Sequence, residues 1–154
     1  MRRVDRKIQN RGEIIDVLWR CDTIRLGING EPFPYVVPVS FGFEDTGGVL
    51  KIYFHGAAQG FKHDLLDKNN RVCVESDMFH KYSETANGGV TAFYESFIGF
   101  GTACVVTGEE AAKGMNLILA HCGYDGFVYD KNALKMMRIY KIVLTEMTGK
   151  RNIT

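Results

Sequence analysis

Several features that mark large classes of protein are missing from this sequence. It has no internal repeat and no low-complexity linker, and with three prolines and 45% apolar residues it is not a disordered or fibrous chain. No run approaches the ~18 consecutive apolar residues of a membrane helix, and the N-terminus has no signal-peptide core. We therefore expect one globular domain over residues 1–154, located in the cytoplasm.

The cysteine and charge patterns exclude two more classes. None of the four cysteines forms a C-x-x-C pair and no histidine pair completes a zinc pattern, so no metal site is predicted. The net charge of +1 gives no field that would attract nucleic acid or an anionic membrane, and we expect neither as a partner. One short basic run exists: Arg2, Arg3, Arg6 and Lys7. Such an arm can grip phosphates, although more often it is solvated or packs on a neighbour.

The hydrophobic pattern predicts many strands and few helices. Apolar alternation indicates strands over residues 23–28, 33–43, 49–55, 71–78, 91–107 and 138–147. Helical periodicity indicates helices over 11–21 and 61–68, with helical turns from Leu134 before the last strand. A further helix should open on a capping box at 107–110 and end at Gly123. Pro34 and Pro38 remove ladder donors, so their strand should lie at an edge or carry a bulge.

The order of these elements favours a barrel over a doubly wound sheet. A parallel sheet would need a crossover helix between most of its strands, and this sequence has too few helices for that. Many β segments without regular βαβ alternation are typical of a closed antiparallel barrel. We predict a mainly β chain, an antiparallel barrel with peripheral helices.

One segment has the pattern of an anion site. Residues 52–66, IYFHGAAQGFKHDLL, run from a strand through a loop of small residues to a helix that carries Lys62 near its start. Free N–H groups and the positive end of the helix dipole would face the loop, and Lys62 adds a full charge. Small side chains let the backbone approach a phosphate closely. An ordinary strand-to-helix turn with a solvated lysine would show the same spacing.

Five stretches, in this order and at this spacing, resemble a known family. They are MRRVDRKI, PYVVPVSFGFED, LKIYFHGAAQGFKHDLLDKNNRVCVE, FYESFIGFGTACVV and TGKR, which together cover nearly the whole chain. The sequence resembles the pyridoxamine 5′-phosphate-oxidase-like superfamily of FMN-binding split barrels, and within it the 5-nitroimidazole-resistance (Nim-type) group. The resemblance implies an antiparallel split β-barrel that works as a homodimer, with the flavin at the subunit interface.

The resemblance also assigns the site residues. It places Lys62 on the flavin phosphate and the loop from Gly56 to Gly60, including Ala57, beside it. His55 and Gly56 would lie near the ribityl-phosphate or the ring. The residues along the flavin ring would be Pro38, Val39, Ser40 and Phe41, through their backbone groups and the Ser40 hydroxyl. Tyr94, Glu95 and Ser96 would lie close to the cofactor or to the dimer seam. The implied cofactor is FMN, with FAD as the alternative because both share the ring, the ribityl chain and the first phosphate.

His55 is the candidate for a substrate-side catalytic group, because it ends a strand at the cofactor loop. An imidazole there could donate a hydrogen bond to an acceptor molecule or shuttle a proton. A structural histidine that holds the loop is the other interpretation. His63, on the following helix, is expected to be exposed or adjacent to the phosphate.

The sequence departs from the family pattern in places. Asn69-Asn70 stands where the related oxidases often have Asn-Pro, and Ala57 and Ala58 stand where relatives place a hydroxyl. The basic substrate apparatus of a true pyridoxamine-phosphate oxidase is not evident, so we do not expect that activity.

The resemblance implies a flavin-dependent reductase that passes electrons to a small acceptor, a nitroimidazole in the Nim-type branch. Two alternatives stay open at this point. One is a flavin-binding module without turnover, for storage or sensing, since no unambiguous general acid is visible. The other is a related barrel that binds haem or a deazaflavin.

Overall fold

A computed structural model describes residues 3–153 of the chain. Its main feature is a single antiparallel sheet in the strand order β3-β2-β6-β7-β8-β5-β4, with the short strand β1 paired to β8. The strands are β1 Lys7–Ile8, β2 Ile24–Ile28, β3 Tyr35–Val39, β4 Phe41–Thr46, β5 Val49–Ala57, β6 Arg71–Glu84, β7 Val90–Val106 and β8 Met137–Asn152. The predicted mainly β, antiparallel architecture is confirmed.

The helices are α1 Arg11–Trp19, α2 Phe61–Lys68 and α3 Gly108–His121, with the 3-10 turns η1 Val4–Arg6 and η2 Lys131–Met136. The Asn10 side chain accepts the N–H groups of Gly12 and Glu13, which caps α1. The predicted capping box at Thr107 is wrong, since the Thr107 side chain accepts no helix N–H. Gly108 follows it with a φ of 60°, outside the helical region, so the first turn does not have the geometry of a capping box.

The sheet bends round on itself because of one short connection. β3 and β4 lie at opposite ends of the strand order, yet only Ser40 separates them along the chain. The two ends of the sheet must therefore meet at Ser40, and the connection closes the barrel without ladder hydrogen bonds between these strands. The predicted single strand over 33–43 is wrong at this point. Pro38 is tolerated because β3 is an edge strand that pairs only with β2.

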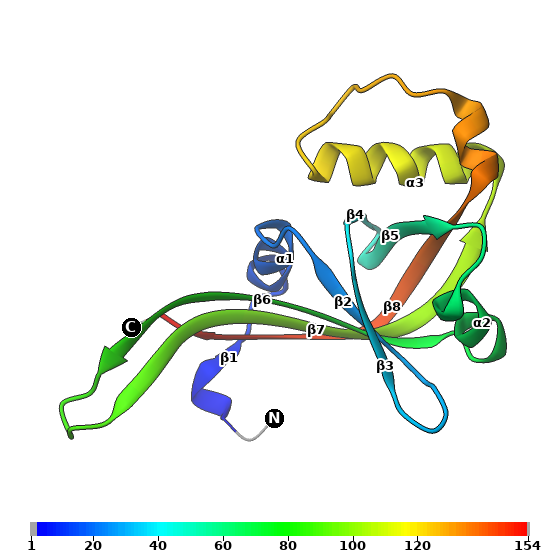
Figure 1. Cartoon of the computed structure of the whole chain (residues 1–154). Helices are drawn as coiled ribbons and strands as arrows, with labels where there is room; N and C mark the ends of the chain where they lie inside the picture. Colours follow the sequence, from blue (N-terminus) through cyan, green and yellow to red (C-terminus); the bar gives the residue numbers. More distant parts are fainter. Residues whose placement is uncertain (1–2, 154) are drawn as a thin grey trace.

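The barrel interior holds the hydrophobic core, and α3 covers one end of the barrel (Figure 1). Fully buried side chains from six strands fill the interior: Leu26, Phe41, Ile52, Phe54, Val74, Phe97 and Ile142. Two glycines let α3 approach β4 and β5 closely. A Cβ on Gly42 would lie 2.2 Å from the carbonyl carbon of Leu117, and one on Gly114 would lie 2.7 Å from Cδ1 of Tyr53.

β6, β7 and the end of β8 continue well beyond the barrel as a long arm, on the opposite side from α2 (Figure 1). The strand predicted over 71–78 runs on to Glu84, where it pairs with Val90. The sequence pattern missed this extension because residues 79–84, FHKYSE, do not alternate between apolar and polar. This part of the sheet is held by ladder hydrogen bonds more than by a buried face.

Candidate functional site

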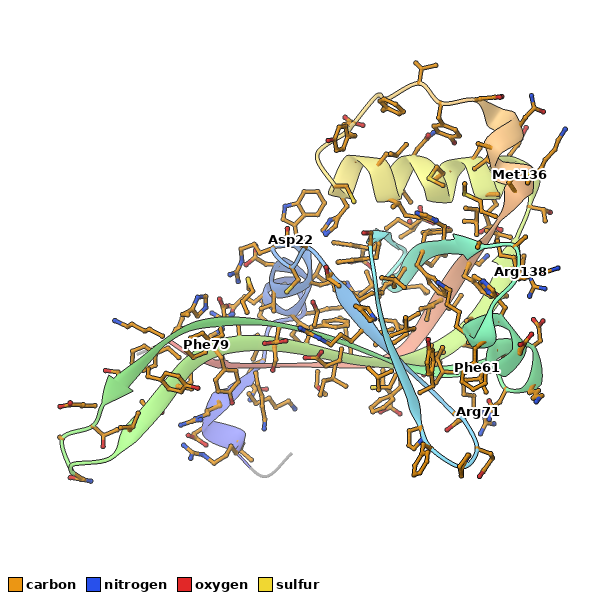
Figure 2. The ribbon with its side chains drawn as sticks, viewed as in Figure 1. Asp22, Phe61, Arg71, Phe79, Met136 and Arg138 are labelled. Atoms are coloured by element: carbon orange, nitrogen blue, oxygen red, sulfur yellow. The ribbon has the colours of Figure 1, made fainter. Side chains whose placement is uncertain are left out.

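Two segments that the sequence singled out meet at the α2 end of the barrel. β4 pairs with β5 from Phe41 opposite Phe54 onward, so Ser40 lies next to His55, one step beyond this pair. The Tyr35 ring of β3 packs edge-on against Phe61 of α2, with ring centroids 5.2 Å apart. Figure 2 labels Phe61 and Arg138 at this end of the molecule. The structure therefore brings residues 38–41 and 55–62 together.

Lys62 lies over Gly56, and only glycine leaves room for it. A Cβ on Gly56 would lie 2.6 Å from Cε of Lys62, 2.7 Å from its Nζ, and 2.9 Å from Cε1 of His63. The Lys62 Nζ is 5.9 Å from the centroid of the Phe54 ring. Burial lowers the pKa of Lys62. This close packing between the loop and the lysine was not predicted from the sequence.

The positive charge of Lys62 is not neutralised by a carboxylate of the described residues. Over residues 3–153, no carboxylate oxygen lies within 4.0 Å of its Nζ. Gly60 precedes α2 and has no side chain that could cap the first N–H groups of the helix. A partly buried cation therefore lies beside free backbone donors, an arrangement that favours an anion.

His63 packs α2 against the sheet. Its side chain is only 1% exposed, its Nδ1 is 2.9 Å from the Tyr140 hydroxyl, and its ring is stacked on the Tyr140 ring. Burial, followed by the charges of Lys62 and Arg138, lowers the pKa of His63. The expectation of an exposed His63 is wrong, because α2 turns this residue towards the ring of Tyr140.

Arg138 and Tyr140 are two residues of this site that sequence reasoning missed. Arg138 lies opposite Gly56 in the β5–β8 ladder, and its Nη1 donates to the Tyr140 hydroxyl at 3.4 Å and to Asp67 of α2 at 2.9 Å. The Tyr140 ring in turn stacks on Phe54. The sequence pattern predicts that both residues lie on the last strand. Only the pairing of β8 with β5 shows that they lie next to the loop.

His55 lies at the exposed edge of the same site. The loss of surrounding water, followed by the charge of Lys62, lowers its pKa, which favours the neutral imidazole. A neutral ring keeps one donor and one acceptor nitrogen available. The structure thus places His55 beside the loop, and its chemical role stays a prediction.

The other predicted ring contacts differ in exposure. Pro38 and Ser40 are exposed, whereas Val39 is half-buried and packs against the core. Phe41 is fully buried in the core and packs on Phe43 and His121. Its side chain is therefore not available to a cofactor.

Tyr94 and Ser96 lie in a different part of the chain. Ser96 pairs with Lys150 of β8, whereas Gly56 pairs with Arg138 of the same strand. Twelve residues of strand separate these positions, or ~40 Å at ~3.3 Å per residue. Within one subunit, Tyr94 and Ser96 are not brought together with Lys62.

A hollow of about 610 Å³ lies beside the site, between α3 and the start of β8. Met137, which lines it, pairs with Ala57 of the loop, and Arg138 lies at its rim. The lining is mainly apolar: Val105, Val106, Ala111, Ala112, Leu134 and Ile139. Such a surface suits a small, largely apolar molecule next to the loop.

Two structural features are not found among residues 3–153. No group of three or more His, Cys, Asp or Glu side chains is placed so that it could hold a metal ion. Within the same residues, no helix has the length and apolar character needed to span a membrane.

The comparisons with known proteins agree with this geometry. The family model for pyridoxamine 5′-phosphate oxidase matches residues 10–151. No curated protein sequence matches the chain. A solved structure from Bacteroides thetaiotaomicron VPI-5482, of a protein with a proposed role in 5-nitroimidazole antibiotic resistance, is 28% identical. The match covers 94% of this chain and 85% of that one, with a TM-score of 0.83.

Two further structures share the fold at lower identity. The flavocytochrome Anf3 from Azotobacter vinelandii is 14% identical, covers 100% of this chain and 72% of its own, and has a TM-score of 0.82. An FAD-binding protein from Mesorhizobium loti is 17% identical, with coverage of 96% and 97% and a TM-score of 0.67.

Proposed function

The chain belongs to the pyridoxamine 5′-phosphate oxidase family, and from this premise we propose that the Lys62 site binds the phosphate of a flavin. The single observation that carries the proposal is the half-buried charge of Lys62 over the Gly56 cradle, with no carboxylate partner among residues 3–153. A phosphate would supply the missing negative charge and accept hydrogen bonds from the loop and from the start of α2. FMN is the expected cofactor and FAD the alternative, because this site recognises the phosphate that both share.

The residues at the β3–β4 junction would hold the flavin ring. Ser40 and Pro38 are exposed beside His55, so the Ser40 hydroxyl and nearby backbone groups are free to meet a polar ring edge. When bound, a flavin supplies the electron-transfer chemistry that no side chain of this protein has. His55 would then orient an acceptor by hydrogen bonding, or hold a proton for it, since its lowered pKa keeps it neutral near pH 7.

We propose that the site is completed by a second copy of the chain. Tyr94 and Ser96 lie far from Lys62 along β8 in one subunit, and a partner subunit would bring them to the same cofactor. The long sheet also leaves large apolar side chains exposed, including Phe79, Tyr82, Ile98 and Phe100. A homodimer that covers these side chains would bury apolar surface and enclose the cofactor at its interface.

The reaction that this arrangement supports best is the reduction of a small acceptor by a flavin-dependent reductase. The apolar hollow next to Met137 and Arg138 is adjacent to the loop and has the size of a small-molecule site. The Bacteroides thetaiotaomicron protein, which is 28% identical and has a proposed role in 5-nitroimidazole resistance, suggests nitroimidazoles as the acceptor class. A flavin-binding module without turnover is the second candidate, since His55 has no carboxylate within 4.0 Å in the described chain to act with it as an acid–base pair.

A turnover experiment separates these two functions. Purified protein loaded with flavin would be mixed anaerobically with NADH or NADPH, and flavin absorbance would be followed before and after a nitroimidazole is added. Bleaching by the donor and recovery with the acceptor is the result expected of the reductase. Bound flavin that no donor reduces would refute the reductase and leave the binding module.

A further inference from the structure

The N-terminal arm and the end of β8 lie side by side, although they are far apart in the sequence. β1 pairs with β8 so that Lys7 lies opposite Lys150. On the other side of β8, Ser96 pairs with the same Lys150. The basic arm, the TGKR stretch and the FYES stretch therefore meet at one place, at the end of the sheet remote from Lys62. The proposed flavin-phosphate site uses neither the arm nor TGKR.

Three cations in this cluster have no acidic partner among the described residues. Within residues 3–153, no carboxylate oxygen lies within 4.0 Å of a side-chain nitrogen of Arg6, Lys7 or Lys150. Lys7 and Lys150 are directly opposite on neighbouring strands, where like charges repel each other. The Nε of Arg6 is buried and makes no hydrogen bond. Each of these features costs stability in the free chain, and a bound anion would offset all of them.

The nearby carboxylates are already engaged elsewhere. Arg20 of α1 donates two hydrogen bonds to Glu95, and Arg151 pairs with Glu13 of α1. Asp77, which lies opposite Ser96, accepts a hydrogen bond from Arg25 at 2.7 Å. The surface formed by Arg6, Lys7 and Lys150 therefore keeps an excess of positive charge, although the whole chain is nearly neutral.

An aromatic ring adjoins these cations. The guanidinium carbon of Arg6 is 6.0 Å from the centroid of the Tyr94 ring, and Tyr94 is only partly buried. Proteins recognise nucleotides by combining cations that bind the phosphate with an aromatic ring on which the base can stack. Ser96, opposite Lys150, adds a hydroxyl that can donate a hydrogen bond.

We infer that Arg6, Lys7, Lys150 and Tyr94 form a second phosphate-binding site, which takes the phosphate of a nucleotide. That the ligand is a nucleotide rests on the proposed flavin function, whereas the anion site itself is inferred from the cluster of cations alone. The phosphate has two possible sources in a flavin reductase. It belongs either to the adenylate half of FAD held by a second copy of the chain or to the pyrophosphate of a nicotinamide donor.

Calorimetry with inorganic pyrophosphate and with ADP tests the site directly. The proteins compared would be the wild type, Arg6→Gln, Lys150→Gln and the control Lys81→Gln. Lys81 is an exposed lysine of the same sheet, 5.4 Å from the Phe93 ring. We expect Arg6→Gln and Lys150→Gln each to weaken both ligands about tenfold, and Lys81→Gln to leave them unchanged. We also expect the Tm of Lys150→Gln to equal or exceed that of the wild type, because a repulsion is removed.

Affinities for FMN, FAD, NADH and NADPH identify the source of the phosphate. If Arg6→Gln and Lys150→Gln lose affinity for FAD but keep their affinity for FMN, the site binds the phosphate of the flavin's adenylate half. If they lose affinity for NADH or NADPH instead, the site binds the pyrophosphate of the donor. Equal binding of pyrophosphate and ADP by all four proteins would overturn the inference, as would binding lost in Lys150→Gln only together with a lowered Tm. A wild type that binds neither FMN nor FAD would refute the flavin function instead, and the pyrophosphate result would still be readable.

Discussion

Replacement of Lys62 by alanine is the perturbation that the site geometry defines best. A hydrogen bond to a charged group contributes about 1.5–3 kcal/mol, and partial burial reduces screening by salt. Lys62 has no carboxylate within 4.0 Å in the described chain, so a phosphate would not compete with an internal ion pair. We therefore expect Lys62→Ala to cost about 2–3 kcal/mol of flavin binding, a ~30- to 150-fold weaker Kd.

The same substitution should not weaken the flavin-free protein. A half-buried charge without a partner is costly to desolvate, so its removal should leave the Tm unchanged or slightly higher. Quenching of flavin fluorescence would measure the Kd, and thermal unfolding without flavin would measure the Tm. Lys68→Ala is the matched control, since Lys68 is an exposed lysine in the last turn of the same helix.

Two results would contradict the assignment of Lys62 to the flavin phosphate. An unchanged Kd for FMN in Lys62→Ala would move the phosphate site away from α2. A weaker Kd accompanied by a large fall in the Tm of the flavin-free protein would mean that Lys62 supports the fold rather than the ligand.

Further predictions concern three substitutions and two titrating groups, around the Lys62 loop and around Glu95. Gly56→Ala should weaken FMN binding more than tenfold, because its Cβ would lie 2.7 Å from Nζ of Lys62, and its overpacking should cost about 1–3 kcal/mol in a urea titration. Tyr140→Phe should lower the unfolding free energy by about 1–3 kcal/mol, since buried His63 loses its hydroxyl partner. The lowered pKa of His63 should also reduce wild-type stability as the pH falls below 6.5, and pH-independent stability between 7 and 5 would contradict this. Arg20→Ala should cost about 3 kcal/mol because Glu95 is left buried without its main partner. Since ion pairing lowers the pKa of Glu95, that loss should shrink as the pH falls below 4.5, which denaturant titrations at several pH values would detect.

Local patterns in the sequence were enough to place most of the strands and helices. Alternation and helical periodicity depend on neighbouring residues, so α2 was predicted with its observed bounds and β7 to within one residue at each end. The break at Ser40 was missed because it depends on where the two ends of a curled sheet meet. The capping box at Thr107 failed for a local reason, the backbone conformation of Gly108, which residue types alone do not reveal.

The candidate site was only partly predictable for a similar reason. The loop, Lys62 and His55 are contiguous in the chain, so their composition could suggest an anion site, although an ordinary strand-to-helix turn has the same spacing. Arg138 and Tyr140 reach the loop only through the β5–β8 register, which no short motif specifies. The remote position of Tyr94 and Ser96 also follows from register. They were predicted to lie close to the cofactor or to the dimer seam, and their distance from Lys62 in one subunit favours the contact that we propose across a dimer.

The most direct test of flavin binding is the identity of the molecule that copurifies with the protein. Visible absorbance of the purified protein, followed by denaturation and mass spectrometry of the released small molecules, would measure it. We expect a yellow protein that releases FMN or FAD, in an amount approaching one per chain after reconstitution. A colourless protein that takes up neither flavin, or one that releases haem or a deazaflavin instead, would contradict it.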